Sequence, residues 1–111
     1  MAVEAGDHVD AALSALADAN RRSILAVVRS GARPVGQIAQ ETGLSQQATT
    51  YHLGVLRAAG LVTGERSGTR HLFTVDTDGL AAVRSYLDEF WPDRLTALKA
   101  AVESNAGGPD G

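Results

Sequence analysis

Cysteine is absent from the 111-residue sequence. Its absence excludes disulfides, zinc sites built on thiolates and cysteine nucleophiles. Long apolar runs are missing too: none approaches the roughly 20 residues that a membrane-spanning helix needs. The N-terminus also lacks the charged and then apolar order of a signal peptide. We therefore expect a soluble, cytoplasmic protein that forms one domain.

The signatures of catalysis are missing as well. No histidine has an evident acidic partner, no glycine-rich loop has the pattern that cradles phosphates, and no pair of carboxylates stands on a rigid element. The glycines fall at predicted turns and helix ends. The sequence therefore predicts neither an enzyme nor a bound cofactor.

Acidic residues are scarce in one long segment. Residues 20–75 hold seven arginines against only Glu41 and Glu65, although the whole chain carries a net charge of −3. A basic middle between acidic ends fits a core that reads DNA, flanked by dimerising arms. The alternative is a chance segregation of solvated charges.

One segment has both of its helix ends marked. Ser45 is a good N-cap because its hydroxyl can accept from backbone N–H groups of the first turn. Gly60 can take the left-handed conformation that follows a helix. Between them, apolar groups recur at spacings of three and four, which predicts a buried side: Ala48, Thr49, Leu53, Val55, Leu56 and Ala59.

The other side of this predicted helix is polar but contains no acid. It carries amides, a hydroxyl, a phenol and a guanidinium, on Gln46, Gln47, Thr50, Tyr51 and Arg57. An ordinary solvated helix face in a protein with more acids than bases would carry Asp or Glu. The groups present are those that a helix offers to base edges in the major groove of DNA.

Shorter elements flank this helix. Residues 34–43 predict a short helix with Pro34 at its first position and Val35, Ile38 and Ala39 turned inward. A tight turn at 43–45 joins the two helices, so together they predict a helix-turn-helix.

Residues 61–75 predict a two-stranded hairpin whose tip lies between Gly64 and Gly68. Arg66 and Arg70 lie at or beside this tip. An arginine there can enter a minor groove or reach phosphates, whereas the alternative is an ordinary solvated side chain. A helix-turn-helix followed by a hairpin is a winged helix.

Three motifs together resemble the ArsR/SmtB family of bacterial winged-helix transcriptional repressors. They are Gly-Leu-Ser-Gln-Gln at 43–47, His-Leu at 52–53 and Val-Leu-Arg-Ala-Ala-Gly-Leu-Val at 55–62. The resemblance extends from Leu13 to Leu98. It implies a mainly helical fold with a small β-hairpin, a homodimer through the N- and C-terminal helices, and double-stranded DNA as the partner.

The resemblance also bears on single residues. His52 matches a common histidine of the family, and we favour a structural or phosphate-contacting role for it over a metal ligand. The family implies a structural role for Arg21, as an ion pair with Asp18 or with an acid of the C-terminal helix; phosphate contact is the alternative. Gly54 stands where the family often has a basic residue, which removes a phosphate contact.

Two helices are expected before residue 31. The first spans 7–17 with Asp7 as its cap, and its apolar stripe is expected to be Val9, Ala12, Leu13, Leu16 and Ala17. The second spans 20–30 with Asn20 as its cap, and Gly31 closes it. Its expected buried side is Ile24, Leu25, Val27 and Val28.

A long apolar stripe ends the chain. It repeats every three or four residues, at Leu80, Val83, Leu87, Trp91, Leu95, Leu98 and Val102. Pro92 predicts a kink or break near 88–91. Because so small a core cannot cover this stripe and that of the first helix, we expect both to pair in a dimer. The predicted interface residues are Val9, Leu13, Leu16, Leu87, Trp91, Leu95 and Leu98.

Composition predicts a disordered tail at 105–111, after a domain at 1–104. Metal sensing is well known in the family, but its ligands are missing. The helix before the turn has no cysteine, and the last helix has Asp88, Glu89 and Asp93 but no histidine. We therefore predict no metal site. A site combining His8 with C-terminal carboxylates across the dimer is the alternative.

The sequence thus predicts a homodimeric DNA-binding repressor that recognises an inverted repeat, with an unidentified effector. The alternatives are a metal-responsive regulator with unusual ligands and a winged-helix module that binds proteins. The predicted DNA-contacting residues are Ser45, Gln46, Gln47, Thr50, Tyr51, His52, Arg57, Arg66 and Arg70.

Overall fold

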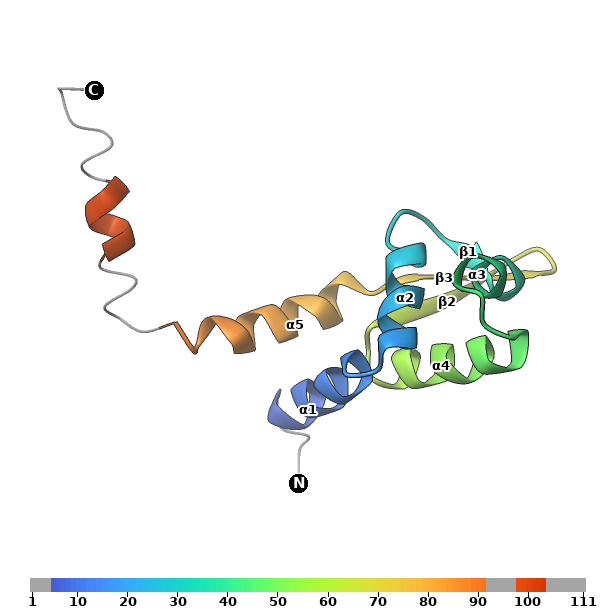
Figure 1. The fold of residues 1–111 in the computed structure, drawn as a ribbon, viewed down its shortest axis with the longest axis horizontal. Coiled ribbons are helices and arrows are strands. Elements are labelled where there is room, and N and C mark those ends of the chain that lie inside the picture. Colours follow the sequence, from blue (N-terminus) through green and yellow to red (C-terminus); the bar gives the residue numbers. More distant parts are fainter. Residues whose placement is uncertain (1–4, 92–97, 104–111) are drawn as a thin grey trace.

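Helices dominate the structure, a computed structural model that describes residues 5–91 and 98–103. The elements are, in order, α1 (Ala5–Leu16), α2 (Ala19–Val28), β1 (Arg33–Pro34), α3 (Val35–Thr42), α4 (Gln46–Ala58), β2 (Val62–Ser67), β3 (Arg70–Val75) and α5 (Thr77–Asp88). Residues 98–103 are helical as well. The helices α3 and α4 form the helix-turn-helix, and β2 and β3 form the hairpin, called the wing below (Figure 1). The predicted winged helix-turn-helix fold is confirmed.

The sheet has three antiparallel strands in the order β1-β3-β2. The wing strands pair from Val62 opposite Val75 to Ser67 opposite Arg70. The two-residue strand β1 adds to the other edge of β3, with Pro34 opposite Leu72. No local signal in the sequence predicts β1, because a two-residue strand has no periodicity, and its proline is tolerated only because the strand lies at the edge of the sheet.

The tip of the wing lies further along the chain than predicted. Gly68 and Thr69 connect the strands, and Gly68 has a φ of 66°. Gly64 lies inside β2, opposite Phe73. Glycine fits there because a β-carbon would lie only 2.6 Å from Nε2 of His71. This glycine therefore gives room to a ring and is not a turn residue.

Three predicted helix starts are wrong. The helix α1 begins at Ala5, so Asp7 lies within it. The cap of α2 is Asp18 instead of Asn20, because the Asp18 carboxylate accepts the first-turn N–H groups of Asn20 at 2.8 Å and Arg21 at 3.2 Å. Pro34 occupies the cap position of α3, in extended backbone, instead of the first helical position.

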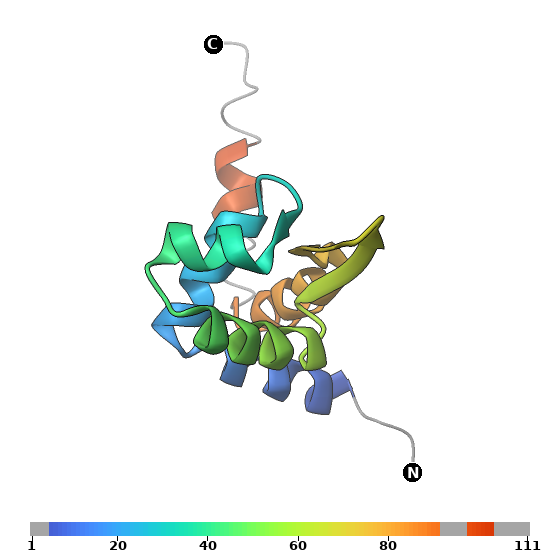
Figure 2. The same ribbon diagram turned by 90° about the vertical axis from the view of Figure 1, so that its right-hand side faces the viewer.

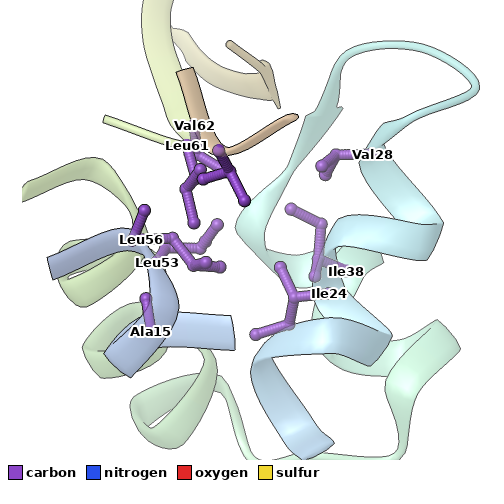
Figure 3. Packing of buried hydrophobic residues seen from close by; sticks show 10 residues of the cluster. Ala15, Ile24, Val28, Ile38, Leu53, Leu56, Leu61 and Val62 are labelled. Carbon is purple, nitrogen blue, oxygen red and sulfur yellow. The ribbon is translucent and has the colours of Figure 1, made fainter. Parts of the chain in front are cut away.

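All five labelled helices and β2 contribute to one core (Figure 3). The predicted inward sides of α2, α3 and α4 are confirmed, with Ile24, Ile38 and Leu56 fully buried. The side of α1 differs from the prediction. Its small residue Ala15 is buried beside α2 and α4, whereas Leu13 is exposed. Val9 and Ala12 of the predicted stripe are buried, but Ala17 is exposed beyond the end of α1, and Ala15, which was not predicted, is buried in its place.

A close approach fixes α5 against the end of α4. Asp76 caps α5 by accepting the N–H groups of Asp78 and Gly79. A β-carbon at Gly79 would collide with the carbonyl oxygen of Gly60. Gly60 itself has a φ of 78° and ends α4 in the left-handed conformation, as predicted. The wing, α4 and α5 are therefore joined at one point.

The helix α5 runs away from the sheet (Figure 1) and ends at Asp88. This end confirms the predicted break near residues 88–91. The predictions for Leu95 and for the tail at 105–111 fall outside the described residues. None of the helices in 5–91 and 98–103 is long and apolar enough to cross a membrane.

Candidate nucleic-acid interface

The start of α4 is held by the residues that its sequence predicted. Ser45 Oγ accepts from the N–H of Ala48 at 3.0 Å. Gly43 ends α3 with a φ of 76°, and its N–H donates to the Ala39 carbonyl at 3.0 Å. The sharp turn between α3 and α4 therefore needs this glycine, and it fixes the direction in which α4 leaves.

The two sides of α4 separate as predicted. Thr49 is fully buried, and its hydroxyl donates to the Ser45 carbonyl at 2.8 Å. Leu53 and Leu56 are buried in the core beside it. The opposite side is exposed and carries Gln46, Gln47, Thr50, Tyr51 and Arg57. Tyr51 exposes 65% of its surface, far more than an aromatic side chain in a core, so it is free to meet a partner.

His52 lies at the edge of this exposed side and faces inward. It is half-buried, and its Nδ1 lies 3.3 Å from Nη1 of Arg21. The Arg21 side chain also donates through Nε to the Ala15 carbonyl at 2.8 Å and lies 3.9 Å from the Asp18 carboxylate. These contacts favour the structural role for both residues, because they tie α4 to the end of α1.

Asp18 gains from the same cluster. The backbone hydrogen bond from Arg21 holds the pKa of the Asp18 carboxyl below its ordinary value, and the N–H of Asn20 acts in the same sense. The positive charge of Arg21 favours the carboxylate further. The start of α2 is therefore best stabilised when Asp18 is ionised.

Three of the seven central arginines are used inside the protein. Arg22 donates to the Leu16 carbonyl at 2.7 Å, Arg21 is bound as above, and Arg33 lies 4.0 Å from the Glu41 carboxylate. Within the described residues, no ion pair involves Arg57, Arg66 or Arg70. Arg29, at the end of α2, also forms no ion pair with a described residue, so three of the four remaining central arginines lie on α4 and the wing.

The wing arginines flank the turn instead of standing at a tip between two glycines. Arg66 pairs with His71 in the register, and Arg70 pairs with Ser67. Both arginines are exposed. They lie at the end of the hairpin that points away from the body of the protein (Figure 2), which suits contact with a second surface.

Sequence analysis assigned no role to His71 and Phe73. They are two positions apart on β3, and their ring centroids lie 4.5 Å apart. Both line a groove between α4 and the wing, together with Thr50 and Arg57. The available signal was their spacing of two on a strand, which places both rings on one face. The part of the chain that the structure describes contains no group of three or more acidic residues and histidines that could hold a metal ion.

Comparison with known proteins agrees with this geometry. A family model described as a helix-turn-helix domain matches residues 16–65. The HTH-type transcriptional regulator Rv2034 of Mycobacterium tuberculosis is 40% identical over 95 residues, which cover 86% of this chain and 89% of that protein. The HTH-type transcriptional repressor SmtB of the same species is 37% identical over 71 residues, 64% of this chain and 53% of that protein.

A solved structure shows the same architecture. The homodimeric winged helix-turn-helix DNA-binding domain Mb0332 of Mycobacterium bovis has a TM-score of 0.61 and 28% identity, and the match covers 90% of this chain and 79% of that one. The chain therefore belongs to the ArsR/SmtB family and is a DNA-binding transcriptional regulator.

Proposed function

We propose that the protein is a homodimeric repressor that binds an inverted-repeat operator by placing two α4 helices in successive major grooves. The observation that carries this proposal is the exposed side of α4. Gln46, Gln47 and Tyr51 are exposed there, and their side chains form no hydrogen bond with another described residue. Unpaired amides at the start of a helix are groups that bind adenine edges.

The remaining contacts divide by chemistry. Arg57 at the end of α4 and Arg66 and Arg70 on the wing supply charge to phosphates, which adds affinity but little sequence information. Thr50 lies one turn after Gln46 and reaches the same groove. Ser45 contributes through its cap, since its hydroxyl is already bound to Ala48. Gly54 offers no side chain, so affinity depends more on the wing.

Dimerisation is supported by apolar surface that the single chain leaves uncovered. The stripe of α5 begins in the core at Val83, but Leu87 exposes 46% of its surface and Trp91 exposes 61%. Leu98 and Leu13 are exposed as well. Such a stripe is favourable only when a partner covers it. A partner would bring the second α4 that an inverted repeat requires.

Two predicted interface residues contribute in another way. Val9 exposes only 6% of its surface and is already part of the protomer's own core. Leu16 is half-buried and packs against the same core. These residues support the position of α1, while Leu13 and the end of α5 present the surface to the partner.

Repression follows from the position of the operator, since a dimer bound across a promoter excludes polymerase. The relative named as a repressor supports this sign of regulation.

Two measurements test the proposal. Selection of bound duplexes from a random pool is expected to return an inverted repeat with half-sites about one helical turn apart. Affinity for that duplex should fall steeply as salt rises, because phosphate contacts release counterions. A selected pool without symmetry would contradict the dimeric mode, and salt-independent binding would contradict the phosphate contacts.

A further inference from the structure

A groove of about 300 Å³ separates α4 from the wing. Val35, Leu53 and Phe73 form its apolar floor, while Thr50, Arg57 and His71 stand around it. This volume lies at the lower end of the range of small-molecule sites, about 300–1,000 Å³. Contacts with DNA phosphates would explain the polar residues around the groove, but they would not explain its apolar floor.

Two glycines keep the groove open. A β-carbon at Gly54 would meet no atom within 4 Å, so the space beside α4 is empty because residue 54 has no side chain. Gly64 has the opposite surroundings: a β-carbon there would lie 2.6 Å from His71 and 3.1 Å from Phe73. Because Gly64 has no β-carbon, both rings can lie against β2, where they line the groove.

The lining selects the chemistry of a ligand. No carboxylate lines the groove, while Arg57 is a permanent cation and His71 and Thr50 offer polar hydrogen-bonding groups. Arg57 suits a carboxylate because its planar guanidinium matches the two oxygens. The floor suits a flat or branched hydrocarbon body. A compact apolar acid satisfies both parts of the site.

We propose that this groove binds a small apolar organic acid, and that the ligand and DNA exclude each other. Thr50 and Arg57 belong both to the groove and to the exposed side of α4. A ligand carboxylate on Arg57 would occupy the charge that a phosphate needs. The site itself stands on the groove alone, whereas the exclusion of DNA rests on the proposed function.

The first experiment uses the full chain without DNA and 2-naphthoate as the probe. Calorimetry should show saturable binding, and NMR shifts should map to Leu53, Phe73 and His71. The neutral isostere 2-naphthamide should bind at least about tenfold more weakly, because it cannot form the charge-assisted pair with Arg57. Arg57→Gln should weaken naphthoate alone, leaving naphthamide unchanged.

Two substitutions at one position separate volume from helix effects. Gly54→Leu extends into the groove and should reduce naphthoate affinity at least about tenfold. Gly54→Ala strengthens the helix without filling the groove and should keep the affinity of the natural chain. Absence of saturable binding, equal binding by both variants, or shifts that map to Trp91 and Leu98 would each overturn the site.

The second experiment adds the selected operator. Saturating 2-naphthoate should raise the protein concentration for half-maximal DNA binding, whereas 2-naphthamide at the same concentration should raise it much less. Unchanged operator affinity under saturating ligand would overturn the exclusion. If naphthoate binds in the groove but no duplex is bound even at low salt, the proposed function fails and the site remains.

Discussion

At the scale of single residues, one arginine connects three helices. The Arg21 guanidinium contacts the carbonyl end of α1, the Asp18 carboxylate at the start of α2 and the His52 ring on α4. Since α1 also carries exposed Leu13, the same side chain links the surface proposed for the partner to the helix proposed to read DNA. Its contacts hold α4 in position.

Asp18 makes the acid stability of the protein predictable. Its pKa is lowered in the folded state, chiefly by the N–H of Arg21. Its contribution to folding is therefore complete above the unfolded pKa and is lost as pH falls through the folded pKa. Asp18→Asn keeps a capping oxygen but does not titrate.

Thermal unfolding should therefore show a smaller loss of Tm for Asp18→Asn than for the natural chain as pH falls below about 4. Asp10→Asn, at an exposed position on α1, is the matched control and should follow the natural chain. Parallel curves for all three proteins would contradict the assigned cause.

At the scale of elements, the effect of replacing a helix glycine on stability depends on how closely another element packs against it. Gly79→Ala drives a β-carbon into the Gly60 carbonyl, so α5 must shift or detach. We expect a loss of about 1–3 kcal/mol in the free energy of unfolding, as for overpacked sites. Gly36→Ala on α3 meets no atom within 4 Å and should instead stabilise by about 0.5–1 kcal/mol.

Urea unfolding followed by circular dichroism measures both variants. Equal effects of the two substitutions would show that the contact between α5 and the end of α4 is loose.

The salt dependence of DNA binding tests whether the wing contacts phosphates. Arg66→Ala and Arg70→Ala should each weaken binding to all duplexes and reduce the slope of log affinity against log salt by about one. Arg29→Ala removes the same charge at the end of α2, which lies on the other side of the molecule from α4 (Figure 1), and should leave the slope nearly unchanged. The slopes come from fluorescence anisotropy at several salt concentrations. An equal slope for all three variants would show that the wing arginines do not contact DNA phosphates.

How much of these elements the sequence predicts depends on where their signals lie. The helix α4 was predicted from Ser45 to Gly60 because its cap, its terminator and its periodicity are all local. The role of Gly64 could not be predicted, because a glycine is equally typical of a turn and of a close contact with a ring. Only the neighbouring rings of Phe73 and His71, which local sequence does not reveal, distinguish the two. The groove was missed for the same reason, since its walls come from three separate elements.

At the scale of the whole molecule, two surfaces remain uncovered and point to two partners. The exposed side of α4 is polar and free of acids, whereas large apolar side chains, Leu87 and Trp91, are exposed at and just after the end of α5. The first suits DNA and the second suits another copy of the chain. Acidic residues lie mainly outside 20–75, so like charge is kept away from the duplex.

Introducing charged side chains tests whether the exposed apolar surface at the end of α5 forms the dimer interface. Leu87→Glu combined with Trp91→Glu should convert the dimer to a monomer, because each carboxylate would be buried without a partner. Ala26→Glu, at an exposed position on α2, should remain dimeric. Sedimentation equilibrium gives the masses, and a dimer in the double variant would place the interface elsewhere.

DNA recognition is proposed to depend on contacts between base edges and the exposed side of α4. The most direct test replaces Gln47 and Tyr51 together with alanine and measures affinity for the selected operator in a protein shown to be folded and dimeric. We predict a loss of at least about tenfold on the operator, since a single good base contact contributes about 1–3 kcal/mol, with little change on unrelated duplex. Unchanged affinity for the operator would contradict the account.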